Sequence, residues 1–264
     1  MRFAKYWVGS ILVLATMAGH ADTNSSALRK EDPPLPVQAI IEKFAAKESE
    51  FQGARERYIY RQTAKVEVLT LDGRRTGEEW LQVTDVLFDD KGKRIEKVVR
   101  APVPTLQSIQ MTPEDVYDLQ NLYPFVLTTA DIEKYNLAYR GKEKIDEIDT
   151  YVFDVIPKTI EKGQRYFEGR IWVDDRDHQI VKTFGKPVYE VTKKNRGYRF
   201  PKFETYRENI DGQYWFPTYS RADEVLQFET GNVRIREVVK YENYRRFEAD
   251  VKFSDVQEVS DQKN

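Results

Sequence analysis

The fold class is decided by residues 151–187, YVFDVIPKTIEKGQRYFEGRIWVDDRDHQIVKTFGKP, which predict three consecutive β-strands joined by turns. On the middle strand one face carries Phe167, Gly169, Ile171 and Val173, and the other carries Tyr166, Glu168, Arg170 and Trp172. Because side chains alternate across a strand, this pattern indicates an antiparallel sheet with one apolar and one mixed face. The segment holds no nucleophile–base pair and no cluster of metal ligands. It therefore favours a sheet that holds something apolar over a catalytic site.

The same two-residue period recurs on both sides of this segment. Asp72-Gly73 and Asp211-Gly212 supply turn signals between neighbouring strands. Consecutive strands joined by short turns usually pair as antiparallel neighbours, which predicts a meander. The expected strands span residues 58–68, 79–88, 95–100, 135–142, 149–157, 165–174, 179–185, 203–209, 214–222 and 232–247.

Two helical segments accompany the strands. Residues 37–51 carry apolar side chains at helical spacing with charged residues between them, which predicts an amphipathic helix. Thr112-Pro113-Glu114-Asp115 reads as a second helix start, with a hydroxyl cap, proline at the first position and acids in the first turn. A short helical turn is expected over 129–133. A helical insertion in an antiparallel sheet protein must cover an apolar face.

The first 21 residues have the pattern of a secretory signal peptide. Arg2 and Lys5 precede an apolar run over 6–17 that is too short to span a bilayer comfortably, and cleavage is expected after Ala21. The alternative is an uncleaved anchor. We expect a flexible leader over 22–36, a single domain over 37–250 and a polar tail over 251–264. No other segment approaches membrane-spanning length, so no integral span is expected after cleavage.

Composition narrows the possible functions. The chain has no cysteine, which excludes disulfides, thiolate catalysis, thiolate zinc sites and a lipid-anchoring cysteine. Its formal net charge is −2, and loss of a signal peptide with two basic residues makes it more negative. Nucleic acid is therefore not an expected partner, because binding the phosphate backbone needs a positive surface.

Residues that could support catalysis or metal binding are few. His178 is the one histidine beyond the signal peptide, and it stands in the acidic turn 174–178. Aspartate is common in tight turns because it bonds nearby backbone N–H groups, so a turn is favoured over a calcium site. A Gly-x-Ser-x-Gly elbow and a phosphate-binding glycine loop are both missing. We expect no catalytic residue, metal or cofactor, although a carboxylate pair for glycan hydrolysis stays open.

Two hairpins carry a family resemblance. Residues 168–174, EGRIWVD, followed by Ile180-Val181-Lys182, resemble a hairpin of the bacterial lipoprotein-sorting proteins of the outer membrane, the LolA-like and LolB-like superfamily. Residues 206–209, YREN, and 211–217, DGQYWFP, are similar to a variant of that superfamily. The order of the expected elements resembles that of the family over most of the mature chain, whereas the residues themselves resemble it in these two hairpins.

The resemblance implies a mainly β fold: an unclosed antiparallel β-barrel, or strongly curved sheet, with helices covering its concave face. It also implies a periplasmic, non-enzymatic carrier in a Gram-negative envelope that shields the acyl chains of lipoproteins or other lipids. Such a chaperone for transport needs a dry pocket, because each exposed methylene costs about 0.8 kcal/mol in water. It would also need a delivery partner at the outer or inner membrane. The helix over 37–51 and the insertion over 112–135 are the candidate lid.

The expected cavity is lined by apolar residues of both helical segments and of the sheet. Two other functions stay open: a cell-envelope glycan hydrolase with a carboxylate pair, and a non-catalytic envelope interaction or sensor scaffold with a filled core. The volume and lining of the space between helices and sheet distinguish these three functions. The residues expected to contact ligand are Ile40, Phe44, Val66, Leu119, Leu122, Phe125, Ile171 and Val173.

Overall fold

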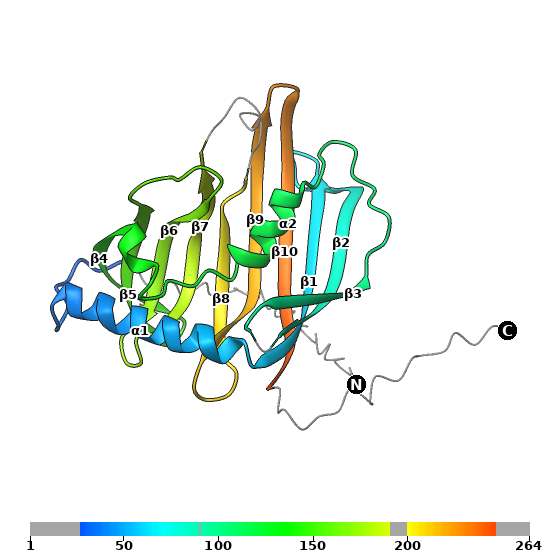
Figure 1. The fold of residues 1–264 in the computed structure, drawn as a ribbon. Coiled ribbons are helices and arrows are strands. Elements are labelled where there is room, and N and C mark those ends of the chain that lie inside the picture. Colours follow the sequence, from blue (N-terminus) through cyan, green and yellow to red (C-terminus); the bar gives the residue numbers. More distant parts are fainter. Residues whose placement is uncertain (1–26, 90, 191–199, 247–264) are drawn as a thin grey trace, which may run out of the picture.

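A computed structural model describes residues 27–89, 91–190 and 200–246 of the chain (Figure 1). The predicted signal peptide, the polar tail from residue 251 and most of the basic connection after residue 187 lie outside the described residues. Within the described part, no helix combines the length and apolar character that a membrane crossing requires.

The fold is built on one sheet of ten strands, all paired antiparallel (Figure 1). The strand order is β3-β2-β1-β10-β9-β8-β7-β6-β5-β4, so β1 and β10 join a short meander to a long one. The edge strands β3 and β4 are not hydrogen-bonded to each other, and the barrel is unclosed. The strands are β1 (Tyr58–Leu69), β2 (Arg75–Phe88), β3 (Arg94–Arg100), β4 (Tyr135–Ile145), β5 (Ile148–Pro157), β6 (Arg165–Asp174), β7 (Ile180–Tyr189), β8 (Phe203–Asn209), β9 (Trp215–Phe228) and β10 (Gly231–Arg246).

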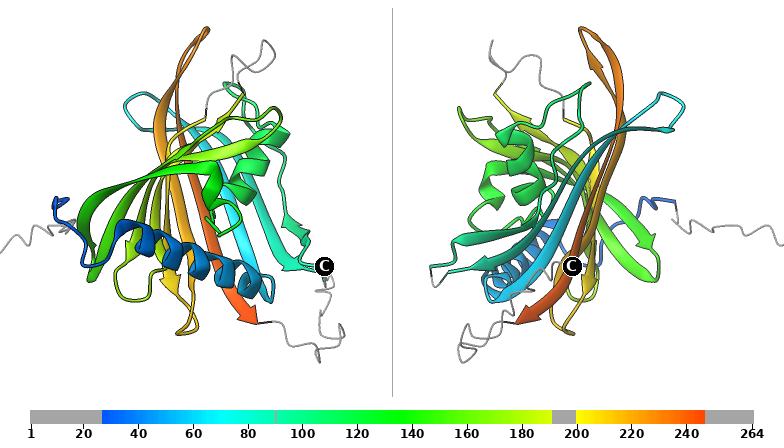
Figure 2. Two further views of the ribbon diagram at one scale, coloured as in Figure 1. Left: turned by 60° about the vertical axis from the view of Figure 1, so that its left-hand side comes forward. Right: turned by 90° about the vertical axis from the view of Figure 1, so that its right-hand side faces the viewer.

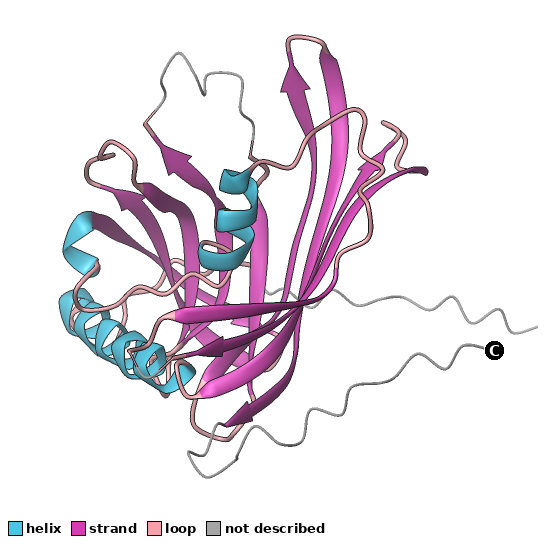
Figure 3. Ribbon diagram, turned by 45° about the vertical axis from the view of Figure 1, so that its right-hand side comes forward, coloured by secondary structure: helices cyan, strands magenta, loops and turns pink. Residues whose placement is uncertain are grey.

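The chain between β3 and β4 must travel from one edge of the sheet to the other. This connection crosses the concave face and contains helix α2 (Pro113–Asn121) and the 3-10 turn η1 (Ile132–Lys134) (Figures 2 and 3). A sheet this curved leaves apolar side chains on its inner face, and the crossing segment covers them. The topology therefore explains why the helical insertion follows β3.

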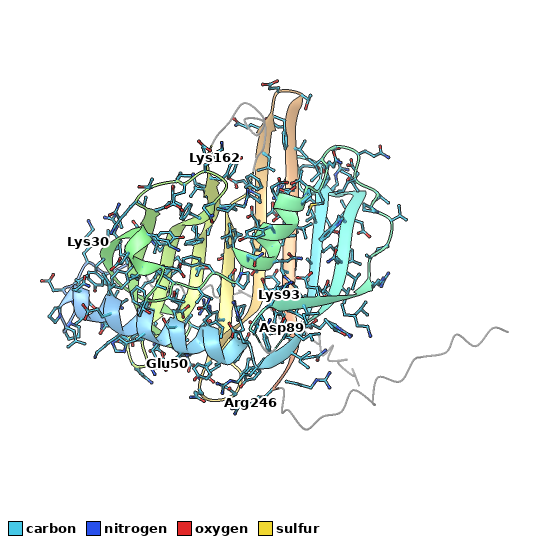
Figure 4. All side chains as sticks on the ribbon, in the orientation of Figure 1. Lys30, Glu50, Asp89, Lys93, Lys162 and Arg246 are labelled. Carbon is cyan, nitrogen blue, oxygen red and sulfur yellow. The ribbon has the colours of Figure 1, made fainter. Side chains whose placement is uncertain are left out.

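Helix α1 (Val37–Arg55) lies across the lower part of the same face (Figure 2). Its apolar stripe, with Ile40, Phe44 and Phe51, is fully buried, whereas Glu50 is exposed (Figure 4). The Phe44 ring meets the Phe153 ring of β5 edge-on at a centroid distance of 5.5 Å. The helix ends at Arg55, four residues beyond the predicted end at Phe51, and β1 begins at Tyr58.

The predicted fold class is confirmed. The sheet is antiparallel, strongly curved and open, and both helices lie on its concave side, as the resemblance implied (Figures 2 and 3). Every predicted strand is present. The main differences are at the strand ends. Strand β7 runs on to Tyr189, and β9 continues past Ala222 to Phe228 because its backbone keeps pairing with β10.

The edge strand β4 is partly covered by the leader. Arg29 forms a bridge with Lys142, with N–H···O distances of 2.8 and 2.9 Å in the two directions. At Gly141, where φ is +133°, an added Cβ would lie 2.1 Å from the Arg29 carbonyl oxygen. Glycine thus permits the close approach, and the leader satisfies backbone groups that an open edge would expose.

Side chains from α1, α2, the segment after α2 and the sheet fill most of the concave face with one core (Figure 4). The faces of β6 are as predicted for Ile171 and Val173, which belong to this core, and for Trp172, which packs on the opposite face. Tyr166 differs: the alternation predicts it on the face of Trp172, but it is buried in the core with Phe167. The space between helices and sheet is therefore mainly packed interior. Beside α2, this face keeps a cavity.

Candidate functional site

A cavity of about 260 Å³ lies beside α2, where the helix and the loop before it face β9, β10 and the chain before β8. It is smaller than the roughly 300–1,000 Å³ typical of sites for drug-sized ligands. Most of its lining is apolar, as expected for a small-molecule site. The apolar lining includes Met111, Leu119, Pro187, Leu226, Phe228 and Ile235.

Three carboxyl groups also line this cavity, those of Asp115, Asp118 and Glu237. No lysine, arginine or histidine is among the described lining residues. Asp115 and Asp118 project from α2, and Glu237 projects from β10. An acidic group in a mainly apolar cavity marks a functional-site candidate, because burial of charge is expensive and needs a reason.

Helix α2 forms because its first turn is capped. The Thr112 hydroxyl accepts a hydrogen bond from the Asp115 N–H at 3.2 Å, and Asp115 Oδ2 accepts from the Thr112 N–H at 2.7 Å. Pro113 occupies the first helical position. This capping box satisfies donors that a helix start leaves free, and it confirms the predicted helix start. One oxygen of Asp115 is thus used by the helix itself.

Asp118 is held by Arg165 at the start of β6. The guanidinium meets both carboxylate oxygens, with Nε donating to Oδ1 at 2.6 Å. The side chain of Asp118 is 4 % exposed and that of Arg165 is 12 % exposed. The Tyr189 and Phe200 rings lie 4.9 and 4.6 Å from the Arg165 guanidinium carbon. The negative charge of Asp118 is therefore already balanced by a fixed cation.

Among the residues that the structure describes, Glu237 has no such counter-ion. Its Oε2 accepts a hydrogen bond from the Tyr123 hydroxyl, and no hydrogen bond to Oε1 is found among the described residues. Glu237 is 8 % exposed, and its neighbours across the sheet are Val66 and Ala222. Burial raises the pKa of Glu237 to about 7, the hydrogen bond from Tyr123 opposes the rise, and the charges of Asp115 and Asp118 add to it. Glu237 is therefore a carboxyl group that is poised to change charge near neutral pH.

This environment predicts a pH-dependent stability. Because the pKa of Glu237 is higher in the folded protein than the usual value of 4.5, the folded state binds its proton more tightly than the unfolded state. The contribution of Glu237 to the free energy of unfolding should therefore fall as the pH rises from about 4.5 to about 7. Glu237→Gln should remove this component. The urea midpoint, measured against pH for both proteins, checks it; equal slopes over that range would contradict the environment described for Glu237.

The two helices are attached to the sheet differently. Along α2 the contacts to neighbouring strands include a buried hydrogen bond, from Gln62 Nε2 to the Leu119 carbonyl at 3.1 Å, and a half-buried one, from Gln120 Nε2 to Glu96 at 2.8 Å. Helix α1 buries the ion pair between Glu48 and Arg207 of β8 more completely than α2 buries that between Asp118 and Arg165, with side-chain exposures of 0 % and 1 % against 4 % and 12 %. Helix α1 is therefore the fixed cover, and α2 borders the cavity.

The eight residues expected to contact ligand have different positions. Leu119 lines the cavity. Six others lie in the packed core with it: Ile40, Phe44, Leu122, Phe125, Ile171 and Val173. Val66 is fully buried on the same face, outside that core cluster and opposite Glu237. The structure thus brings most of them together as interior, and ligand contact at the seven that do not line the cavity stays a prediction.

The acidic turn at 174–178 has turn geometry. Asp174 Oδ1 accepts from the Arg176 N–H and Asp177 Oδ1 accepts from the Gln179 N–H, at 2.8 and 2.9 Å. His178 has φ +60° and is half-buried, and burial lowers its pKa. The carboxylates serve the backbone, as the sequence pattern favoured. In the part of the chain that the structure describes, no group of three or more acidic, histidine or cysteine side chains is arranged to hold a metal.

The chain was also compared with known proteins. No family model matches it, and no curated protein matches it. It is similar to the crystal structure of a DUF1329 family protein from Desulfovibrio piger, at 17 % identity and a TM-score of 0.44, over 82 % of this chain and 95 % of that one. A putative outer membrane lipoprotein-sorting protein domain from Vibrio parahaemolyticus is similar at 14 % identity and a TM-score of 0.36, over 82 % and 96 %. A LolA superfamily protein from Nitrosomonas europaea is similar at 15 % identity and a TM-score of 0.32, over 81 % and 94 %.

Proposed function

We propose that this protein is a periplasmic binding or carrier protein that shields the apolar part of an amphiphilic molecule in the cavity beside α2. The observation that carries the proposal is the cavity itself: a mainly apolar space beside α2, on a concave face that is otherwise filled. Burying apolar surface there is favourable at about 25 cal/mol per Å². The predicted signal peptide supports a location outside the cytoplasm.

The size of the cavity sets what the described state can hold. About 260 Å³ suits one small ligand or the end of one chain, not the several long acyl chains of a lipoprotein. Carriage of a lipoprotein would need α2 and the segment after it to move away from the sheet. Helix α1 is unsuited to such movement because opening it would separate the buried charges of Glu48 and Arg207. Moving α2 would separate Asp118 from Arg165, a pair that is less completely buried, with exposures of 4 % and 12 %, so α2 is the better candidate for the moving cover.

The lining of the cavity favours binding over glycan hydrolysis. Hydrolysis needs two carboxyl groups with separate roles on either side of the bond that breaks. Asp118 is taken up by Arg165, and Asp115 serves the cap of α2. Of these three carboxyl groups, Glu237 is the one that neither caps a helix nor pairs with a basic side chain among the described residues.

A cavity-filling variant tests the proposal. Ile235 is 2 % exposed and lines the cavity, so Ile235→Trp should fill the space and weaken binding of the neutral fluorescent probe N-phenyl-1-naphthylamine by about tenfold or more. The control is Val238→Trp, on the same strand but the opposite face, which should leave affinity unchanged. Circular dichroism establishes that both variants fold. If the wild-type chain fails to bind the probe, or if Ile235→Trp binds it equally well, the proposed site is wrong.

A further inference from the structure

The polar part of the cavity has one sign of charge. Three carboxyl groups line it, and no described lining residue is basic. Asp118 already has its cation, Arg165, and Asp115 is partly used by the cap of α2. Glu237 is more than nine-tenths buried, is paired with a neutral hydroxyl, and keeps one oxygen without a hydrogen bond among the described residues. Within the described ranges, this buried carboxylate has no basic side chain as its counter-ion.

We propose, building on the proposed function, that the amphiphile bound in this cavity carries a cationic amine head group that pairs with Glu237. The ammonium group supplies a positive charge that the described lining lacks, and it donates to Oε1, which has no hydrogen-bond donor among the described residues. The apolar chain then lies along the surface formed by side chains such as Leu226, Phe228 and Ile235.

The opposite head-group chemistry is disfavoured by the same geometry. A carboxylate or phosphate head would face Asp115, Asp118 and Glu237 without a described basic residue in the lining. In a partly dry site the repulsion between like charges is much stronger than in water. An anionic lipid that entered the cavity would therefore bind with its head directed away, towards solvent.

The charged and titratable groups around Glu237 come from α2, from the segment after it and from β6. Tyr123 follows α2 and donates to Glu237, while Asp115 and Asp118 lie on α2, the latter paired with Arg165 of β6. Burial, and then the charges of Asp115 and Asp118, raise the pKa of Glu237 to about 7, while the hydrogen bond from Tyr123 opposes the rise. An amine keeps its charge well above that pH. Amine binding should therefore strengthen as Glu237 ionises, and this trend needs no variant to be observed.

The experiment compares three single-chain amphiphiles of equal length: dodecylamine, dodecanol and dodecanoic acid. Each displaces N-phenyl-1-naphthylamine from the mature wild-type chain at about pH 5.5 and about pH 8.5, on either side of the pKa of Glu237. At the higher pH the amine should bind at least about tenfold more tightly than the acid, which is the effect of one charge-assisted hydrogen bond. Its advantage over the alcohol should shrink at the lower pH.

Glu237→Gln isolates the charge, since the amide can still accept the hydrogen bond from Tyr123. We expect this variant to bind dodecylamine about tenfold more weakly at the higher pH and dodecanol unchanged. The control is Glu242→Gln, the same substitution at an exposed position of the same strand, which should behave as wild type.

The outcomes separate the two proposals. If N-phenyl-1-naphthylamine binds but the acid competes as well as the amine, or if Glu237→Gln weakens all three amphiphiles alike, the amine head group is refuted while the cavity stands. If the wild-type chain binds neither the probe nor any of the three amphiphiles, the proposed function fails, and the head-group inference fails with it. A pH-independent ratio of amine to alcohol affinity also refutes the role of Glu237.

Discussion

Arg207→Ala is expected to lower the free energy of unfolding by about 3–5 kcal/mol, because it leaves Glu48 buried without its partner. The guanidinium donates from Nη1 and Nη2 to the two carboxylate oxygens at 2.8 and 3.1 Å, and Nη2 also donates to the Phe125 carbonyl. Its carbon lies 5.1 Å from the centre of the Phe51 ring. One side chain of β8 thus holds both α1 and the segment after α2. Loss of these contacts should be seen in urea unfolding followed by tryptophan fluorescence.

Two further variants show that burial is the cause. Arg140→Ala removes an arginine of β4 that is 47 % exposed and paired with Asp154, and it should change stability by about 0–1 kcal/mol. Glu48→Leu combined with Arg207→Met should recover much of the loss, since well-packed apolar pairs often replace buried ion pairs at little cost. Recovery should be incomplete, because the Phe125 carbonyl loses its donor. If Arg207→Ala is as stable as Arg140→Ala, this role of Arg207 is contradicted.

The sheet and both helices could be predicted because their signals are local. A two-residue period, turn dipeptides and a helix cap depend on residues that are close in sequence, and each of these was observed as predicted. The face of β6 that carries Ile171 and Val173 was also predicted correctly. What local patterns could not determine is how far the opposite sides of the fold approach one another. The expected ligand contacts are therefore mostly interior, because α1 and the segment after α2 pack directly onto the sheet.

The polar residues that organise the interior did leave a signal in the sequence. Glu48 falls between Phe44 and Phe51 on the apolar stripe of α1. Glu237 stands in phase with Ile235 and Val239 on β10. A charged residue in phase with an apolar face must be paired or functional when the face is buried. Both residues could have been singled out on this ground, although the partner of Glu48, Arg207, lies far away in sequence and only the fold brings them together.

A tightly packed ring on β6 gives the second large effect. Phe167 is fully buried, stacks on Phe125 of the segment after α2 at a centroid distance of 4.4 Å, and covers Gly169 and Gly185. These two glycines face each other across β6 and β7. A Cβ on Gly185 would lie 2.6 Å from the Phe167 ring, so glycine makes the room that the ring occupies. The ring in turn supports the segment that crosses the concave face.

Phe167→Ala should therefore lower the free energy of unfolding by about 3–5 kcal/mol, at the upper end for a phenylalanine because two glycines offer no side chains to fill the space. The control is Phe184→Ala on β7, where the ring is 43 % exposed and should contribute about 1 kcal/mol or less. Urea unfolding measures both. An equal loss from the two variants would contradict the supporting role of Phe167.

Gly185→Ala tests the same packing from the other side. The added methyl meets the Phe167 ring at 2.6 Å and the Glu168 carbonyl oxygen at 2.4 Å, and overpacking of this kind destabilises by about 1–3 kcal/mol. In the double variant with Phe167→Ala the ring contact disappears, while the contact with the carbonyl remains. The combined loss should therefore be smaller than the sum of the two single losses but larger than that of Phe167→Ala alone. Simple additivity would show that the ring and the glycine do not share this space.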